Sequence, residues 1–187
     1  TCADGFCPSF VSVRGAKVKK SRAGLGDLAA LALPTLPEPT LPSFDKEYED
    51  FNILVTGIGG TGVLTVGGII GMAAHLDGCA SSILDMMGLA QKGGAVLSHV
   101  RLAQNNDKLR SPRIVTGRCH TLLACDSIVA ASKDAADLLR ADRSAAVINA
   151  TQSPISDFVR NKDIDFQGLA VDNQLNAVTR NDACFKL

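Results

Sequence analysis

A glycine-rich turn between two apolar segments constrains this chain more than any other feature. Residues 55–78 read VTGIGGTGVLTVGGIIGMAAHLDG, and Gly57, Gly59 and Gly62 have the G-x-G-x-x-G spacing of a dinucleotide-binding turn. In such a turn the first glycine permits the bend from strand to helix. The second lets the backbone approach a pyrophosphate, and the third lets helix and strand pack closely. The motif therefore predicts a strand before it and a helix after it.

The residues on both sides of the turn agree with this prediction. Residues 52–57, NILVTG, form a short run rich in β-branched side chains and bounded by glycine, which is typical of a strand. Over residues 60–76, apolar side chains recur at helical spacing and form a broad apolar surface. Gly67, Gly68 and Gly71 lower the helix propensity of this segment, so we expect close packing to hold it.

The rest of the domain alternates strand and helix signals. We expect strands over residues 81–85, 95–103, 121–126 and 144–150, and helices over residues 132–141 and 166–181. Alternation of this kind indicates βαβ units and a sheet covered on both faces. The predicted fold class is therefore α/β, a three-layer Rossmann-like domain with a mostly parallel sheet.

The first fifty residues have a different composition. Residues 33–42, LPTLPEPTLP, predict an extended, semi-rigid spacer because proline fixes φ and has no amide to donate. Residues 9–21 alternate apolar and polar side chains like a small hairpin, and residues 21–32 favour a short helix. We therefore divide the chain into an N-terminal hairpin with a Pro-rich strap (1–50) and the Rossmann-like domain (51–187).

Charge and composition exclude several classes of protein. The 19 basic and 19 acidic side chains cancel, and no basic stripe with interleaved aromatic residues is present, so we expect no nucleic-acid partner. No apolar run is long enough to span a bilayer, and no signal peptide is visible, so we expect no membrane partner. Four of the six cysteines lie in apolar or mixed segments without regular spacing, which favours reduced thiols and a cytoplasmic location.

Four side chains are candidates for a crevice facing the turn. Asp85 closes the second strand, near where a ribose-binding acid would lie, and Lys92 in MMGLAQKGGAV would place a cation beside a bound anion. Asp126 and Asn149 follow two later strands and would line the same edge, or else cap helices and turns. Lys92 has the alternative of a solvated loop lysine, and the glycines that of a packing role alone. The candidate cofactor-binding residues are Gly57, Gly59, Gly60, Thr61, Gly62, Asp85 and Lys92.

The histidines do not indicate a catalytic or metal centre. His75 ends a predicted helix, His99 lies in an alternating strand, and the Cys119-His120 pair has no second pair at zinc spacing. The order of residues supports no Ser–His–Asp or Cys–His arrangement either. We therefore expect no catalytic residue set and no metal site within this chain.

Cys2 and Cys7 are a separate case. They flank an Asp-Gly turn, and a Cys-Pro pair such as the one at Cys7 ends the iron–sulfur runs of bacterial ferredoxins. A cluster normally needs four thiolates, so two are too few. The pair is either structural or part of a cluster completed by ligands upstream of Thr1.

Two segments taken together resemble a known family. FNILVTGIGGTGVLTVGGIIGMAAHLDG followed by LDMMGLAQKGGAVLSHVRLA is similar to the gamma part of the 2-oxoacid:ferredoxin oxidoreductases, specifically the long fused indolepyruvate:ferredoxin oxidoreductases. GFCPSFVSV, LLACDSIVAAS and TRND also look like segments of those proteins, in the same order. The resemblance covers nearly the whole chain.

The resemblance implies a reaction that the residues themselves do not show. Such enzymes decarboxylate a 2-oxoacid, here an aryl pyruvate, to an acyl-coenzyme A. They use thiamine diphosphate with magnesium, and iron–sulfur clusters that pass electrons to ferredoxin. The resemblance places the thiamine-binding domains upstream in the same polypeptide, and this sequence has no GDG-type metal loop. It also implies that the gamma part is cut short at its C-terminal end and that the chain is not catalytic alone.

Three functions are therefore weighed. In the first, the chain is a non-catalytic gamma domain whose glycine turn serves packing or contact with a neighbouring domain or coenzyme A; a homodimer is compatible with this role. In the second, it is a free-standing NAD(P)-binding oxidoreductase or redox sensor using the turn and Asp85. In the third, it is an interaction module. The resemblance favours the first, because the family's reaction needs no nicotinamide.

Overall fold

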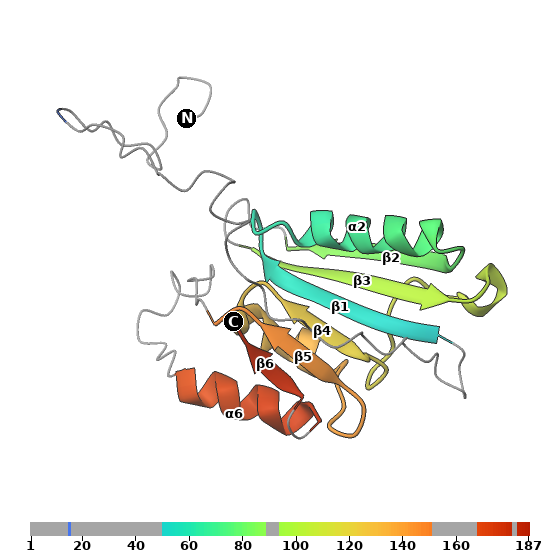
Figure 1. Ribbon diagram of the computed structural model, residues 1–187. Helices are drawn as coiled ribbons and strands as arrows, with labels where there is room; N and C mark the ends of the chain where they lie inside the picture. Colours follow the sequence, from blue (N-terminus) through green and yellow to red (C-terminus); the bar gives the residue numbers. More distant parts are fainter. Residues whose placement is uncertain (1–14, 16–49, 89–93, 151–167, 181–182) are drawn as a thin grey trace, which may run out of the picture. The chain divides into compact units, whose positions relative to one another are not determined.

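The computed structural model describes residues 15, 50–88, 94–150, 168–180 and 183–187 (Figure 1). The chain divides into two compact units, residues 1–41 and 42–187, and every helix and strand described belongs to the second. The predicted hairpin, short helix and Pro-rich strap lie outside the described residues, apart from Gly15.

Helices and strands alternate along the second unit. The strands are β1 (Asp50–Ile58), β2 (Ala80–Met87), β3 (Ala95–Ala103), β4 (Thr121–Ala124), β5 (Ala145–Ile148) and β6 (Cys184–Lys186). The helices are α2 (Val63–Leu76), α3 (Ser127–Ala130), α4 (Lys133–Ala136) and α6 (Gly168–Val178), with a 3₁₀ turn at Asn106–Lys108. The strand and helix predicted on either side of the glycine turn are confirmed as β1 and α2.

The six strands form one mixed sheet in the order β2-β3-β1-β4-β5-β6. From β1 through β4 and β5 to β6 the neighbours are parallel, whereas β3 runs antiparallel to both β1 and β2. The amide of Gly88 donates to the carbonyl of Ala95 at 3.0 Å and closes the connection between β2 and β3. The α/β prediction is confirmed, and the antiparallel β3 is a feature that the strand signals did not reveal.

Successive residues of β1 belong to two hydrophobic clusters, which lie on opposite faces of the sheet. Leu54 belongs to a cluster that includes Leu122, Ile148 and Leu175 of α6. Val55 belongs to the other, with Val63 and partly buried residues of α2. Figure 1 shows α2 along β2 and β3, and α6 beside β5 and β6. The sheet is therefore the middle of three layers, because side chains in a strand point alternately to its two faces.

Two glycines bring α2 close to the sheet. A Cβ built on Gly67 would come within 2.5 Å of Ser98 Oγ, and one on Gly71 within 2.5 Å of Ile83 Cδ1. Gly68 has no atom within 4 Å of the same position, so it lies on the outer side of the helix. Close packing at two of the three glycines agrees with the expectation from sequence.

The helix predicted over residues 132–141 is wrong in its limits. The structure instead has two single turns, α3 and α4, and only Cys125 and Asp126 separate the first from β4. The cause is Asp126, whose Oδ1 accepts hydrogen bonds from the amides of Ile128 (2.9 Å) and Val129 (3.0 Å). This caps a helix earlier than the apolar pattern suggested. The short strand β6 was not predicted.

Candidate functional site

The glycine turn is held by its own backbone and by Thr61. The amide and the hydroxyl of Thr61 both donate to the carbonyl of Ile58, at 3.0 and 2.7 Å. Gly60 and Gly62 have φ angles of 99° and 83°, in the left-handed region that favours glycine. A Cβ on Gly57 would meet Thr61 Oγ1 at 2.5 Å and Val63 Cγ2 at 2.8 Å. Three of the glycines thus have a structural reason to be glycine.

Gly59, the remaining glycine of the turn, contacts the second glycine-rich segment. The amide of Gly59 donates to the carbonyl of Gly94, at a distance of 2.9 Å. Gly94 is the last glycine of GLAQKGG and precedes β3 directly. The amide that could face a pyrophosphate is therefore used within the fold.

An open pocket of about 340 Å³ lies beside the turn, at the carboxyl ends of the parallel strands. Its polar groups come from Thr61, Cys125 and Asn149, and its apolar wall comes from β4 and β5. The lining residues are Thr61, Leu123, Ala124, Cys125, Val147, Asn149 and Leu187. In open α/β sheets this edge is where ligands bind.

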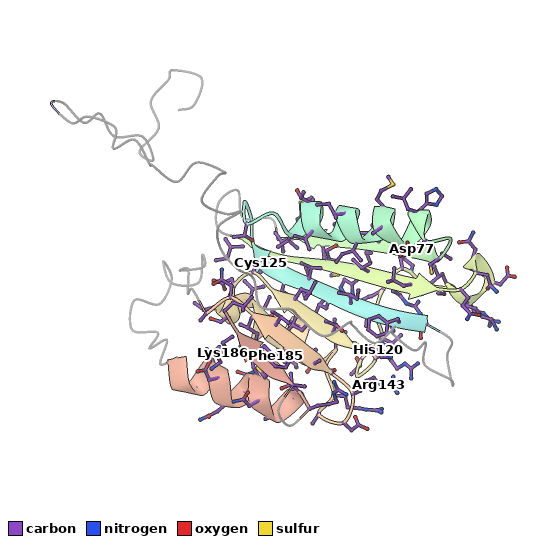
Figure 2. All side chains as sticks on the ribbon, viewed as in Figure 1. Asp77, His120, Cys125, Arg143, Phe185 and Lys186 are labelled. Atoms are coloured by element: carbon purple, nitrogen blue, oxygen red, sulfur yellow. The ribbon has the colours of Figure 1, made fainter. Side chains whose placement is uncertain are left out.

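Cys125 is the thiol of this pocket, and Figure 2 places it at the end of the sheet opposite His120. It is half-buried, and burial together with the negative charge of Asp126 raises the pKa of its thiol. The thiol is therefore mostly protonated near neutral pH and is not an activated nucleophile.

The two other polar candidates at this edge have different roles. Asp126 is buried and caps α3, so the capping alternative is confirmed for it. Asn149 lines the pocket, and its backbone amide donates to the carbonyl of Ala124 at 2.8 Å. Sequence reasoning placed both at the correct edge because both follow parallel strands.

Asp85 and Lys92 are the remaining two candidates. Asp85 lies on β2, opposite Ser98 of β3, which in turn lies opposite Val55 of β1. Two strand spacings, about 10 Å in all, therefore separate Asp85 from the strand that leads into the turn. Lys92 lies outside the described residues. A ligand contact at Asp85 or Lys92 stays a prediction.

A buried polar cluster at the amino end of β1 was missed by sequence reasoning. Asp50 forms ion pairs with Arg101 and with Arg118, the latter at 3.6 Å. Asn52 donates to Asp50 Oδ2 (3.1 Å) and accepts from Arg101 Nε (2.9 Å). His120 Nδ1 accepts from the amide of Asn52 at 3.0 Å. The polar positions 50, 52 and 101 in otherwise apolar strands were the available signal, and the cluster joins β1, β3 and the start of β4.

His99 lies within the fold and away from the pocket lining. It is 1% exposed, and its Nδ1 accepts from the amide of Ile114 at 3.3 Å. Burial, with the nearby charge of Arg113, lowers the pKa of His99. Among the described residues no group of three or more His, Cys, Asp or Glu side chains could hold a metal ion.

Comparison with known proteins identifies the family. The family model described as pyruvate ferredoxin/flavodoxin oxidoreductase matches residues 52–183. The chain belongs to this family. The match contains the glycine turn, the buried residues of both apolar clusters and every residue that lines the pocket except Leu187.

Curated relatives in the family are named indolepyruvate oxidoreductase subunit IorB. The protein from Archaeoglobus fulgidus is 39% identical over 75 residues, which cover 40% of this chain and 35% of that protein. The one from Pyrococcus horikoshii is 28% identical over 82 residues, covering 44% and 39%. The chain thus spans about a third of the length of the curated relatives it matches.

Two solved structures also match the chain in part. A 2-oxoglutarate:ferredoxin oxidoreductase from Magnetococcus marinus is 18% identical with a TM-score of 0.45, covering 74% of this chain and 19% of that chain. Pyruvate oxidoreductase subunit PORC from Thermotoga maritima is 17% identical with a TM-score of 0.43, covering 70% of each chain.

Among the described residues of the present chain, no helix is long and apolar enough to cross a membrane.

Proposed function

We propose that this chain is the non-catalytic gamma part of an indolepyruvate:ferredoxin oxidoreductase. The full enzyme oxidatively decarboxylates an aryl pyruvate to an acyl-coenzyme A and passes the electrons to ferredoxin. The gamma part packs against the thiamine-binding domains and does not carry the reacting groups. The family match over residues 52–183 carries this proposal.

The geometry of the glycine turn supports a structural role. Gly57 has no room for a side chain, and Gly60 and Gly62 have positive φ angles. The backbone amide of Gly59 is hydrogen-bonded to the carbonyl of Gly94. Gly57, Gly60 and Gly62 therefore have a reason to be glycine that involves no ligand, and the amide of Gly59 has a partner within the fold. A turn of this kind fits a domain that has a structural role and packs beside a catalytic domain.

The described cysteines do not fit an iron–sulfur cluster. Clusters are held by thiolates, normally four. Burial raises the pKa of the Cys119 thiol to about 12, and this thiol donates to the carbonyl of Thr121 at 3.2 Å. We propose that the clusters, and thiamine diphosphate with magnesium, are bound mainly by other parts of the full enzyme. There, thiamine diphosphate supplies the electron sink for decarboxylation.

We further propose that the pocket beside the turn contacts part of coenzyme A. Leu123 and Val147 offer an apolar wall for a flexible arm, and Asn149 offers an amide at the rim. The left-handed Gly62 begins α2 without a side-chain cap, which leaves backbone amides at the positive end of the helix dipole for an anionic group. The same features fit any ligand with an apolar arm and a phosphate.

A nicotinamide dinucleotide is the second candidate, because the turn does lie between a strand and a helix. Two observations weigh against it. The Gly59 amide already donates to Gly94, and Asp85 lies two strands from β1. The antiparallel β3 occupies the place where a ribose-binding strand would adjoin β1.

An activity assay tests the non-catalytic role. The purified chain, supplied with thiamine diphosphate, magnesium, coenzyme A, indolepyruvate and ferredoxin, is expected to release no carbon dioxide. Adding the thiamine-binding part of the enzyme is expected to restore turnover. Turnover by the chain alone would overturn the proposal.

A thermal-shift scan with coenzyme A, NADH, NADPH and FAD tests the pocket. A ligand at about 100 times its dissociation constant stabilises by roughly 2.7 kcal/mol, a rise on the order of 5–10 °C for this domain. We expect a shift with coenzyme A that Asn149→Asp reduces, because the added charge repels phosphates. Asn105→Asp, at the other end of the sheet, is the matched control. A shift with NADH alone would favour the dinucleotide function.

Partners and location complete the proposal. Ferredoxin is the electron acceptor of the full enzyme, the thiamine-binding domains are the immediate neighbour, and the location is cytoplasmic. A second copy of the chain is a further proposed partner. Co-purification of this chain with a thiamine-containing chain would support the first partnership.

A further inference from the structure

A second pocket lies between the last turns of α2 and the amino end of β1. Its volume is about 220 Å³, and its lining residues are Phe51, Ile70, Ala73, Ala74, Asp77, Cys79 and Leu102. Phe51 of β1 and Leu102 of β3 lie opposite each other in the sheet and form its floor. The two pockets share no lining residue, and β1 begins at this one and ends at the glycine turn. They are therefore separate sites.

The wall of this pocket is one flank of α2 and its C-cap. Its four residues follow the first at intervals of three, four and seven, which places them on one side of a helix: Ile70, Ala73, Ala74 and Asp77. Ala74 is buried and Ile70 partly buried, whereas Ala73 and Asp77 are exposed. The pocket therefore has an apolar bottom and an acid at its rim.

The end of α2 brings Cys79 back to the same wall. Gly78 has a φ of 76°, and its amide donates to the carbonyl of His75 at 3.1 Å. The amide of Cys79 donates to the carbonyl of Ala74 at 2.8 Å. These two bonds form a Schellman motif, which ends a helix at a left-handed glycine. They fix the backbone on both sides of the pocket rim, where Figure 2 shows Asp77 at the end of α2.

Asp77 is the charged residue of this lining, and it occupies a position that disfavours a carboxylate. The C-terminal end of a helix carries partial negative charge, which favours Lys, Arg or protonated His. α2 reads VLTVGGIIGMAAHL, so His75 is its one basic residue. Within the described part of the chain, no ion pair or side-chain hydrogen bond involves Asp77. A cationic group at the pocket rim would therefore complement both the carboxylate and the helix end.

We propose that this pocket binds a small aromatic amine, with its ammonium group at Asp77 and its ring between α2 and Phe51. An apolar cavity of about 150 Å³ holds a benzene ring, so about 220 Å³ has room for one ring and a short aminoalkyl chain. The ring of His120 stacks on that of Phe51 at 4.8 Å between centroids, which fixes an aromatic surface for the ligand ring. An aromatic acid does not fit, because its carboxylate would face Asp77.

Titration of the full chain with three ligands that share one ring tests the pocket, with NMR spectra of the backbone amides as the readout. Phenethylamine is positively charged, phenethyl alcohol is neutral and phenylacetate is negatively charged. We expect phenethylamine to bind with a dissociation constant on the order of 0.1–1 mM. The alcohol should bind at least about threefold more weakly, and phenylacetate at least about tenfold more weakly. The amide signals of residues 70–79 and of Phe51 should shift.

Two substitutions separate the effect of charge from that of shape. Asp77→Asn should weaken phenethylamine to the affinity of the alcohol and leave the alcohol unchanged. Ala73→Leu should abolish binding of both, because the larger side chain fills the pocket. Ala73 is exposed on α2 and leucine favours a helix, so this variant should fold. Circular dichroism checks folding, and Ala73→Met replaces Ala73→Leu if it fails.

The matched control is Asp134→Asn. Asp134 is an exposed acid on α4, which packs through Ala135 on the sheet face opposite to α2. This variant should change neither affinity. No binding of phenethylamine up to about 10 mM, equal affinities for the three ligands, or an unchanged affinity in Asp77→Asn would overturn the proposal. Retained binding in a folded variant with the pocket filled would overturn it as well.

A fourth probe separates a free amine from a lysine side chain of a protein partner. N-acetyl-lysine methylamide carries the same charge on an aliphatic chain, and we expect it to bind more weakly than phenethylamine because it has no ring to pack on Phe51. Tighter binding of the lysine derivative would mean that the pocket is a protein contact, and the proposal would be wrong. These titrations do not measure turnover, so failure of the carbon dioxide assay leaves their result unaffected.

Discussion

The backbone of Gly59 is hydrogen-bonded to that of Gly94, with 2.9 Å between amide nitrogen and carbonyl oxygen. This bond joins the end of β1 to the start of β3, and so joins the two glycine-rich segments on which the family resemblance rests. The joint occurrence of these segments in one sequence thereby acquires a physical reason. The turn is built to meet the β2–β3 connection.

Gly57 and Gly59 should respond differently to alanine. At Gly57 a methyl group would overlap Thr61 Oγ1, Val63 Cγ2 and Cys125 Cβ at 2.5–3.0 Å, so we expect a loss of about 1–3 kcal/mol. At Gly59 the nearest atom is the Gly94 oxygen at 3.8 Å, so Gly59→Ala should cost less than about 1 kcal/mol. Urea unfolding of both variants measures this. Equal losses would mean that Gly57 is not held by packing.

Asp50 should matter far more than an exposed acid in a similar pair. Its side chain is 3% exposed and contacts two arginines that are 12% and 14% exposed. Asp50→Asn removes the negative charge that both arginines contact, and we expect a loss of about 2–4 kcal/mol. The control is Asp142→Asn, since Asp142 is 67% exposed and pairs with Arg140. We expect no measurable change there, and a comparable loss in both variants would contradict the role of burial.

The thiols of Cys119 and Cys125 should differ in reactivity. Cys119 is fully buried with a pKa of about 12, so iodoacetamide should modify it only as the domain unfolds. Cys125 should react slowly at pH 8, because burial and Asp126 raise its pKa. Asp126→Asn retains a good cap and removes the charge, so it should speed labelling of Cys125 alone. Mass spectrometry of labelled peptides gives both rates, and an unchanged Cys125 rate would contradict the charge effect.

His99 should make the domain sensitive to acid. Its folded-state pKa is lowered from 6.5 by burial and Arg113, so the unfolded chain takes up a proton that the folded chain does not. The free energy of unfolding therefore falls as the pH drops below about 6.5, by at most about 1.4 kcal/mol per pH unit. His99→Gln should flatten this slope relative to the wild-type chain. Chemical denaturation between pH 5 and 8 measures the slopes, and identical slopes would exclude His99.

The local patterns were strong enough to predict some elements and not others. β1, the turn and α2 follow from a strand signal, glycine spacing and helical periodicity in one continuous segment. The place of β3 between β1 and β2 depends on pairing between distant strands. An alternating apolar pattern does not tell whether a strand runs parallel or antiparallel to its neighbours. Cys184–Lys186 is too short for any period to identify, and its pairing with β5 defines it as a strand.

The candidate site divides in the same way. Thr61 and Asn149 fall at one edge because both follow parallel strands, a rule that sequence alone can use. Asp85 was assigned by its distance along the chain from Gly62, which assumes that the second strand adjoins the first. The insertion of β3 breaks that assumption. The Asp50 cluster required the register between β1 and β3, which sequence does not specify.

The place of β1 in the sheet also has a consequence for the order of folding. Both of its neighbours, β3 and β4, come later in the chain. During synthesis β1 and the glycine turn leave the ribosome before either partner strand exists, whereas β2 and β3 can pair across their short connection at once. The pocket beside the turn also needs Val147 and Asn149 from β5 and the segment that follows it. The site is thus completed among the last parts of the domain, although the residues that begin it are made first.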